Sequence, residues 1–463
     1  MSYRSARIAG AIALTSASVW MSPVAVAVTP PVIDDALLPD PRPPAPPQAT
    51  EQRQDCLVST PARKRPAAGE QLETLDLPQV WALSRGSGQT VAVIDTGVAR
   101  HRLLPHLVPG GDYVHSGDGT DDCDGHGTIV AGIIGAADDP TDNAGFSSVA
   151  PEATIIGIRQ SSVKFAPVGQ SAPGFGDVDT LAEAVRTAAD MGASVINVSS
   201  IACLEAAADL DDRALGAALA YAVDVKNVVV VAAAGNVGGL GQCPEQNPPS
   251  DPAHPGQPDW AAVKVVVTPA WYDEYVLTVG STDPRGVPSR FTLAGPWVDV
   301  AAPGEGVVSL DADGEGLVDS LPVLGNPTAI VGTSYAAPVV SGIVALVRAR
   351  SPHLTARQVM QRIKETAHRP PAGWDPFVGH GVVDALAAVS GGAATTSMVA
   401  PMTESANDGV VPDLPERDPQ QDGSGRRIAF GGAGLCVAMV TAALAMTATL
   451  GRSRRKIDNV PRD

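Results

Sequence analysis

The stretch GTSYAAPVVSGIVALV, residues 332–347, sets a serine at the head of a long segment without charge. From Ala336 onward its apolar residues are dense enough for a helix that is buried on all sides in a large domain. Pro338 is then expected in the first turn, where its missing N–H does no harm. Ser334 would lie at the helix N-terminus, beside unpaired N–H groups and the positive end of the helix dipole. This position suits a developing oxyanion, although a plain N-cap is the commoner task of a serine there.

The composition limits the classes of function. The chain has 463 residues, 44% of them hydrophobic, and is long enough for one sizeable core with further segments attached. Its formal net charge of −18 argues against nucleic acid as a partner, because a phosphate backbone would be repelled. One tight basic cluster, Arg63-Lys64-Arg65, is interpreted as a solvated linker, with a cleavage point as the alternative.

Two terminal segments predict location rather than fold. Residues 1–27 contain arginines, an apolar stretch and an A-x-A site, which is the pattern of a secretory signal peptide. Residues 428–451 are 24 positions without a charge, enough at about 1.5 Å per residue to cross a hydrocarbon core of roughly 30 Å as a transmembrane helix. The tail 452–463 begins with basic residues, so the positive-inside rule places the tail in the cytoplasm and the preceding domain outside the cell membrane.

Between these segments the sequence divides into three parts. Residues 28–71 form a proline-rich N-terminal extension, in which eight of the eighteen residues 30–47 are proline, and we expect an extended arm without a helix. Residues 72–390 alternate strand-like and helix-like runs, which predicts an α/β fold with a mostly parallel central sheet and helices on both faces. Residues 391–427 have few large apolar side chains and are typical of a flexible linker.

The hydrophobic pattern predicts the elements of the α/β domain. Strands are expected at 90–94, 154–158, 194–198, 227–232, 275–279 and 298–300. Helices are expected at 178–191, 211–225, 334–350 and 355–366. The proline- and glycine-rich stretches 164–177 and 240–259 are expected to be surface loops.

Three further stretches carry side chains suited to chemistry. TVAVIDTGV is a buried strand that ends in Asp95, so a carboxylate emerges at the carboxyl edge of the sheet, where α/β proteins form ligand sites. CDGHGTIVAGIIG places His126 between two glycines at the start of an apolar helix. VVVVAAAGN delivers Asn236 to a loop after another buried strand. Taken alone, each of these residues has a plain structural explanation as a cap or a turn former.

Taken together, the three stretches join Ser334 in one pattern. The order Asp95, His126, Ser334, each at a strand end or a helix start, is the chain order of the subtilisin type of serine-protease triad. The blocks AVIDTGV, DGHGT, AAAGN and GTSYAAP resemble signature blocks of the subtilisin-like serine proteases, and VINVSS and VDVAAPG resemble two further segments. The resemblance covers roughly residues 72–390. It implies a subtilisin-like fold and hydrolysis of peptide bonds. We expect no cofactor and no metal ion at the site.

The resemblance also implies a role for each matching residue. Asp95 is expected to orient His126, which takes the proton of the Ser334 hydroxyl as general base and returns it to the leaving amine. Asn236 and the Ser334 N–H are expected to form the oxyanion hole. The residues expected to bind the substrate as an added strand are Asn197, Ser199, Ser200, Ala232, Ala233 and Gly235.

The segments around the predicted protease domain narrow the resemblance. A signal peptide, a proline-rich arm with a cysteine and a C-terminal transmembrane helix together resemble the mycosins, membrane-anchored subtilases associated with type VII secretion systems. This resemblance implies protein or peptide substrates, the processing of secreted substrates, and membrane secretion-complex subunits as partners. Because residues 28–71 leave little room for a compact folding prodomain, we expect the arm to wrap around the domain and stay attached.

Export favours disulfide bonds among the four cysteines that precede the predicted membrane span, whereas Cys436 lies within the span. Four cysteines allow three pairings. We prefer Cys56 with Cys123, which ties the arm to the main domain, and Cys203 with Cys243, which closes a local loop. Free thiols are the alternative.

Other classes of protein fit less well. The DTG at 95–97 also occurs in aspartic proteases, but their mechanism requires two carboxylates and the sequence has no second DTG or DSG. Ser334 lies in G-T-S-Y-A rather than in the G-x-S-x-G of α/β-hydrolases. The acidic loop 118–124 lacks an EF-hand pattern and is interpreted as solvated, with calcium binding as the alternative. A rival of another class is a secretion-complex scaffold whose protease activity is incidental.

Overall fold

The computed structural model describes residues 28–391 except 60–69, 139–145, 171–173, 207, 209, 240–241, 250 and 324. The predicted signal peptide, transmembrane helix and tail, and the predicted linker beyond Gly391, lie outside these ranges. Within the described ranges, every helix is too short or too polar to cross a bilayer.

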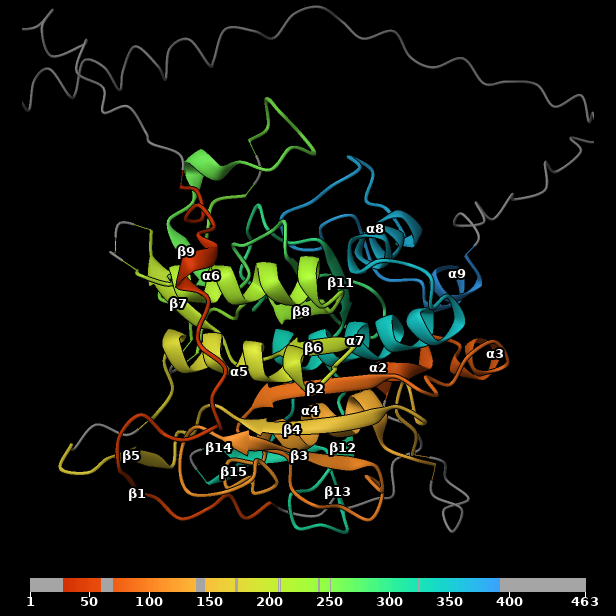
Figure 1. Ribbon diagram of the computed structural model, residues 1–463. Coiled ribbons are helices and arrows are strands. Elements are labelled where there is room, and N and C mark those ends of the chain that lie inside the picture. Colours follow the sequence, from red (N-terminus) through yellow and green to blue (C-terminus); the bar gives the residue numbers. More distant parts are fainter. Residues whose placement is uncertain are drawn as a thin grey trace, which may run out of the picture. The chain divides into compact units, whose positions relative to one another are not determined.

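A seven-stranded sheet forms the centre of the domain (Figure 1). Its strands are β2 (Thr90–Asp95), β3 (Leu107–Asp112), β4 (Thr154–Arg159), β6 (Val195–Val198), β8 (Val229–Ala233), β10 (Val276–Thr282) and β11 (Val300–Pro303). They lie in the order β11-β10-β8-β6-β2-β4-β3, and all neighbours are parallel. The central strands β6 and β8 are buried throughout, in keeping with sequences that are apolar except for Asn197 in β6. The predicted α/β class with a mostly parallel sheet is confirmed.

Six of the seven strands overlap predicted ones, β11 only at Val300, and β3 was not predicted. Its sequence LVPGGD carries Pro109 and two glycines, which the hydrophobic pattern does not distinguish from a loop. The strand tolerates Pro109 because it lies at the edge of the sheet, and its pairing with β4 is irregular between Pro109 and Gly111.

Helices cover both faces of the sheet (Figure 1). On one face α4 (His126–Gly135) packs beside α7 (Thr333–Arg350), and on the other α5 (Val178–Asp190) packs beside α6 (Arg213–Ala220). The other helical elements are η1 (Asp35–Leu37), α2 (Glu70–Glu73), α3 (Leu77–Trp81), η2 (Tyr221–Val225), η3 (Trp260–Ala262), α8 (Ala356–Thr366) and α9 (Ala385–Ser390).

Two helices begin within one residue of the predicted start, and each is fixed there by a capping box. Asp177 accepts a hydrogen bond from the N–H of Thr180 at the start of α5, and the hydroxyl oxygen of Thr180 accepts one from the N–H of Asp177. Thr355 and Gln358 make the equivalent pair at the start of α8. These reciprocal bonds satisfy N–H groups that a helix leaves unpaired in its first turn.

Four short antiparallel pairs lie outside the main sheet. They are β1 (Thr50–Gln52) with β5 (Phe165–Pro167), β7 (Ala202–Glu205) with β9 (Val265–Thr268), β12 (Ser309–Leu310) with β13 (Leu317–Val318), and β14 (Ser320–Val323) with β15 (Asn326–Ala329). The stretch 164–177, expected to be a loop, therefore contains β5.

The N-terminal arm runs along the surface of the domain. Its first described residue, Val28, donates a backbone hydrogen bond to Trp260 at 3.2 Å, and β1 adds a strand to β5. Within residues 30–47, where we expected no helix, the chain forms the 3₁₀ turn η1. This turn lies between prolines of the arm. The structure joins Cys56 to Cys123 and Cys203 to Cys243, the pairings that we preferred.

Candidate active site

The start of α7 differs in one respect from the expectation. The helix begins at Thr333, so Pro338 lies in the second turn rather than the first. Because Pro338 has no N–H, the carbonyl of Ser334, four residues earlier, has no donor within the helix. That carbonyl instead accepts a hydrogen bond from the hydroxyl of Ser199 at 2.9 Å. The proline thus leaves free an acceptor that ties the first turn of α7 to the segment after β6.

A chain of buried hydrogen bonds supports this contact. The amide nitrogen of Asn197 donates to the Ser199 hydroxyl at 2.9 Å, and its oxygen accepts from Ser341 of α7 at 2.8 Å. Asn197 is completely buried. It therefore lies beneath the site and fixes Ser199, which in turn fixes the backbone of Ser334.

Asp95 and His126 meet at the carboxyl edge of the sheet. The Nδ1 atom of His126 lies 2.6 Å from Oδ1 of Asp95, which also accepts from the N–H of Thr96 at 2.8 Å. Asp95 is fully buried, whereas 26% of the His126 side chain is exposed. Burial disfavours the charged imidazolium, but the charge of Asp95 and its hydrogen bond outweigh burial and hold the pKa of His126 above its ordinary value. The ring is thus anchored at one nitrogen and open to the pocket.

Ser334, His126 and Asn236 line one pocket, whose volume is about 740 Å³. Ser334 is 9% exposed. Among the described residues, no hydrogen bond joins the Ser334 hydroxyl to the His126 ring, although both side chains line the pocket. Catalytic hydrogen bonds of this kind often form only when substrate is bound. The other side of the ring packs against Tyr335, with the ring centroids 5.2 Å apart.

The orientation of Asn236 is fixed by Thr333. The side-chain oxygen of Asn236 accepts from both the N–H and the hydroxyl of Thr333, which leaves its Nδ2 with two protons to donate elsewhere. A Cβ on Gly332 would lie 3.1 Å from the Ser334 hydroxyl and 3.6 Å from Asn236 Nδ2. Both groups therefore border the space that this glycine leaves open.

Only part of the predicted substrate-binding set lines the pocket. Ser199 and Ser200 do. The other four, Asn197, Ala232, Ala233 and Gly235, are buried and are not among the residues that line this pocket, and their part in substrate binding stays a prediction. Ala232 and Ala233 belong to β8, which is buried throughout, and Asn197 points towards α7.

Several pocket residues were missed by the sequence reasoning. One wall consists of the segments 160–164 and 174–178, and another of Leu321, Pro322 and Val323 in β14. Neither wall could be predicted, because a loop rich in glycine and proline and a short hairpin have no regular alternation of apolar and polar residues. The nearest clue was the position of β14 and β15 between β13 and the Ser334 segment.

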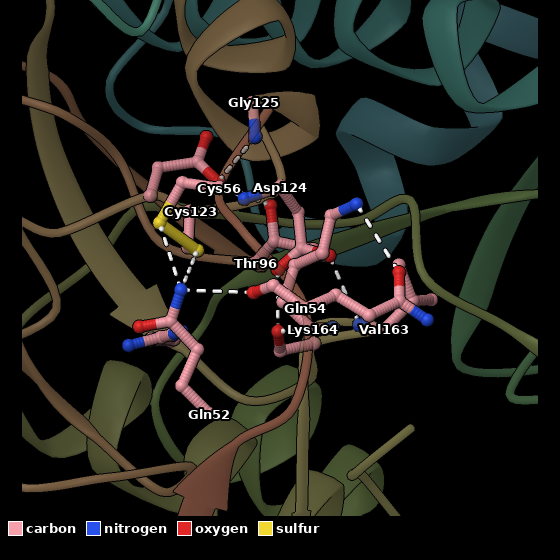
Figure 2. Close-up of a disulfide and its surroundings, with 12 residues drawn as sticks. Gln52, Gln54, Cys56, Thr96, Cys123, Asp124, Gly125, Val163 and Lys164 are labelled. Carbon is pink, nitrogen blue, oxygen red and sulfur yellow. Dashed lines mark hydrogen bonds between the residues drawn. A yellow bond between two sulfur atoms is a disulfide. The ribbon is translucent and has the colours of Figure 1, made fainter. Parts of the chain in front are cut away.

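The N-terminal arm also contributes to the pocket. Leu57 lines it, next to the disulfide between Cys56 and Cys123, and donates a backbone hydrogen bond to Cys123 at 2.8 Å. Figure 2 shows this disulfide close to Asp124 and Gly125, which directly precede His126. A Cβ on Gly125 would lie 2.7 Å from the Leu57 side chain. The link therefore places the arm at the edge of the site.

We expected the acidic loop 118–124 to be solvated, but two of its carboxylates are held by protein donors. Asp122 accepts hydrogen bonds from Thr96 and Thr128, and burial raises its pKa to about 6. Asp124 lines the pocket and accepts from the N–H of Val163 at 2.9 Å. The loop's carboxylates thus face protein donors as well as water.

Comparison with known proteins places these features in a family. The family model described as Subtilase family (Peptidase_S8) matches residues 86–381. Mycosin-4 of Mycobacterium tuberculosis (strain ATCC 25618 / H37Rv) is 57% identical over 465 residues, which cover 98% of this chain and 97% of that protein. The crystal structure of MycP1 from the ESX-1 type VII secretion system has a TM-score of 0.72 at 41% identity and covers 85% of this chain and 99% of its own. A structure of an intact ESX-5 inner membrane complex contains a chain that matches with a TM-score of 0.73 at 39% identity, covering 91% of this chain and 100% of its own.

The chain belongs to the subtilase family and, within it, to the mycosins. It is a subtilisin-like serine protease, as the resemblance predicted.

Proposed function

We propose that Asp95, His126 and Ser334 form the catalytic triad of this protease. The observation that carries the proposal is the 2.6 Å contact between His126 Nδ1 and Asp95 Oδ1 at the edge of a pocket that Ser334 also lines. Asp95 fixes the ring tautomer that carries the proton on Nδ1, so Nε2 is the acceptor for the Ser334 proton. His126 then donates that proton to the leaving amine.

The tetrahedral intermediate places a negative oxygen beside the start of α7. Asn236 Nδ2 and the Ser334 N–H are the donors for this oxygen. The N–H groups of the first turn have no partner within the helix, and the helix dipole adds positive potential at this end. The side-chain oxygen of Asn236 accepts from the Thr333 N–H, so its Nδ2 is the atom that can donate to the oxyanion.

We further propose that the substrate is an extended segment of protein. Ser199 and Ser200 line one side of the pocket, and the segment 174–178 lines it as well. An extended peptide between two such backbone edges gains main-chain hydrogen bonds as an added strand, with side-chain pockets supplying preference.

The test is cleavage of a library of fluorogenic peptides by the full chain. Ser334→Ala is expected to abolish cleavage while leaving the fold intact, because the nucleophile alone is removed. Ser351→Ala, at the end of the same helix, is the matched control and should cleave as the unaltered chain does. Unchanged cleavage by Ser334→Ala would falsify the assignment of the nucleophile.

The location and partners are the second part of the proposal. We infer that residues 428–451 anchor the protease in the membrane, with the catalytic domain outside the cytoplasm and in contact with subunits of a type VII secretion complex. Two findings support this inference: the similarity to chains of the ESX-5 inner membrane complex and its periplasmic assembly, and the charge pattern around the apolar segment.

A cell-based experiment separates the protease from the rival scaffold function. Secretion is compared in cells that lack the gene, cells with the unaltered gene, and cells that carry only Ser334→Ala. Loss of secretion in the deletion but not in Ser334→Ala would assign a structural role to the chain beside its activity. Extraction of the chain by detergent but not by high salt tests the anchor, because only hydrophobic insertion resists salt.

A further inference from the structure

Asp122 is the centre of a hydrogen-bond network that the catalytic proposal does not use. Its Oδ1 accepts from the Thr96 hydroxyl at 2.8 Å, the Gly125 N–H at 2.8 Å and the Asp124 N–H at 3.2 Å. Its Oδ2 accepts from the N–H and the hydroxyl of Thr128 at 2.8 and 2.7 Å. An ionised carboxylate suits this set of donors because both of its oxygens accept hydrogen bonds and neither donates one.

The network caps the helix that carries His126. The N-cap residue of α4 is Gly125, which has no side chain to accept from the first turn. The N–H of Gly127 donates instead to the Thr96 hydroxyl at 3.0 Å, and the N–H of Thr128 donates to Asp122. Two of the N–H groups that this helix start leaves unpaired are thus satisfied from outside the helix.

The same network holds the end of the strand that carries Asp95. Thr96 follows Asp95 directly, and its N–H donates to Asp95 Oδ1 at 2.8 Å. The Thr96 hydroxyl donates to Asp122 and accepts from Gly127, so one side chain joins the end of β2 to the first turn of α4. These two elements present the carboxylate and the imidazole to each other.

We propose that Asp122 is a positioning residue for catalysis, which fixes the Asp95–His126 contact by clamping the end of β2 to the start of α4. The inference rests on the proposed triad and deepens it. Asp122 touches neither substrate nor the reacting atoms in this scheme, and it acts through Thr96 and the N-terminus of α4.

Asp122 also changes the electrostatics of His126. Its negative charge adds to those of Asp95 and Asp124 in raising the pKa of His126. Tyr335, which packs against the His126 ring, has a pKa raised well above its ordinary value by burial and by Asp95 and Asp122, so it stays neutral. Removal of the Asp122 charge therefore lowers the pKa of His126, an effect that a merely structural residue would not have.

The experiment measures kcat, KM and the pH profile of peptide cleavage for Asp122→Asn in the full chain. The amide cannot accept all five hydrogen bonds, so we expect kcat to fall on the order of 10- to 100-fold with little change in KM. The acid limb of the kcat/KM profile is expected to move to lower pH. Asp121→Asn, an exposed carboxylate next to Asp122, is the matched control and should leave kcat and the acid limb unchanged.

A kcat and an acid limb that both stay at the values of the unaltered chain would overturn the inference. If Asp122→Asn fails to fold, Thr96→Val tests the same clamp by removing one hydroxyl, and Thr96→Ser, which keeps it, should retain more of kcat than Thr96→Val. Equal loss in both Thr96 variants would count against the clamp. Ser334→Ala tests the proposed triad separately from the role of Asp122. If Ser334→Ala still cleaved peptides, the triad assignment itself would be wrong, whatever the Asp122 variant does.

Discussion

The side-chain oxygen of Asn236 accepts two hydrogen bonds from Thr333, one from its N–H at 2.9 Å and one from its hydroxyl at 3.1 Å. Thr333 is fully buried, and its hydroxyl accepts in turn from the N–H of Gly235 at 3.2 Å. The residue before the proposed nucleophile thus fixes the proposed oxyanion donor. This coupling preorganises the donor, and preorganised donors contribute most when charge develops in the transition state.

Asn236→Ala is therefore expected to lower kcat by a factor on the order of 100 to 1,000, with KM nearly unchanged, because an oxyanion donor acts only in the transition state. Steady-state peptide cleavage measures both constants. Thr333→Val, which keeps the N–H and loses the hydroxyl, should give a smaller loss. A rise in KM without a fall in kcat would instead assign Asn236 to substrate binding.

The pH dependence of cleavage follows from His126. A general base must be neutral, and Asp95 holds the pKa of His126 above its ordinary value of 6.5. Activity is thus lost as pH falls through the raised pKa, and kcat/KM should rise with a midpoint above 6.5. A profile of kcat/KM from about pH 5 to about pH 9 tests this, since it reports the free enzyme. A midpoint below 6.5 would contradict the expected balance of burial and charge.

Gly127 is required where α4 approaches the end of β2. A Cβ at this position would lie 2.0 Å from the carbonyl oxygen of Gly97 and 3.1 Å from the Cβ of Asp95. Gly127→Ala should destabilise the domain by about 1–3 kcal/mol and reduce cleavage, because the helix must shift away from Asp95. Denaturant unfolding and peptide cleavage measure the two effects. Gly316→Ala, whose added Cβ would have no neighbour closer than 3.4 Å, should leave both unchanged.

The disulfide between Cys56 and Cys123 spans 67 residues of sequence. Closing a loop of that size restricts the unfolded chain, so replacing both cysteines with serine should lower the free energy of unfolding by about 2–4 kcal/mol. Denaturant unfolding of the double variant gives this value directly. A loss well below about 1 kcal/mol would mean that the contacts of β1 and Leu57 hold the arm without the covalent link.

The sequence predicted those elements whose local hydrophobic pattern matches their burial in the folded domain. Buried parallel strands have near-continuous apolar runs, and β2, β6 and β8 could be located from them. Asp95, His126, Asn236 and Ser334 could be singled out because each lies at or just after the end of a strand or at the start of a helix within a distinctive block, and their catalytic roles stay a prediction.

Other features depend on which segments pack together, and that information is not local. Asp122 looked like one more solvated acid, since its donor Thr96 is 26 positions away in sequence. Asn197 looked like a cleft residue, yet it meets Ser341, which is 144 positions distant. The pocket walls at 174–178 and β14 carry no periodicity that would single them out.

The bond between Cys56 and Cys123 has one more consequence for the arm. Scission of the backbone anywhere between Ser59 and Gln71, the interval that contains Arg63-Lys64-Arg65, would yield two polypeptides that still share a sulfur–sulfur bridge. A nicked protease would migrate as one species until a reductant is added. Proteolytic maturation in that interval would therefore leave Leu57 at the pocket instead of discarding it.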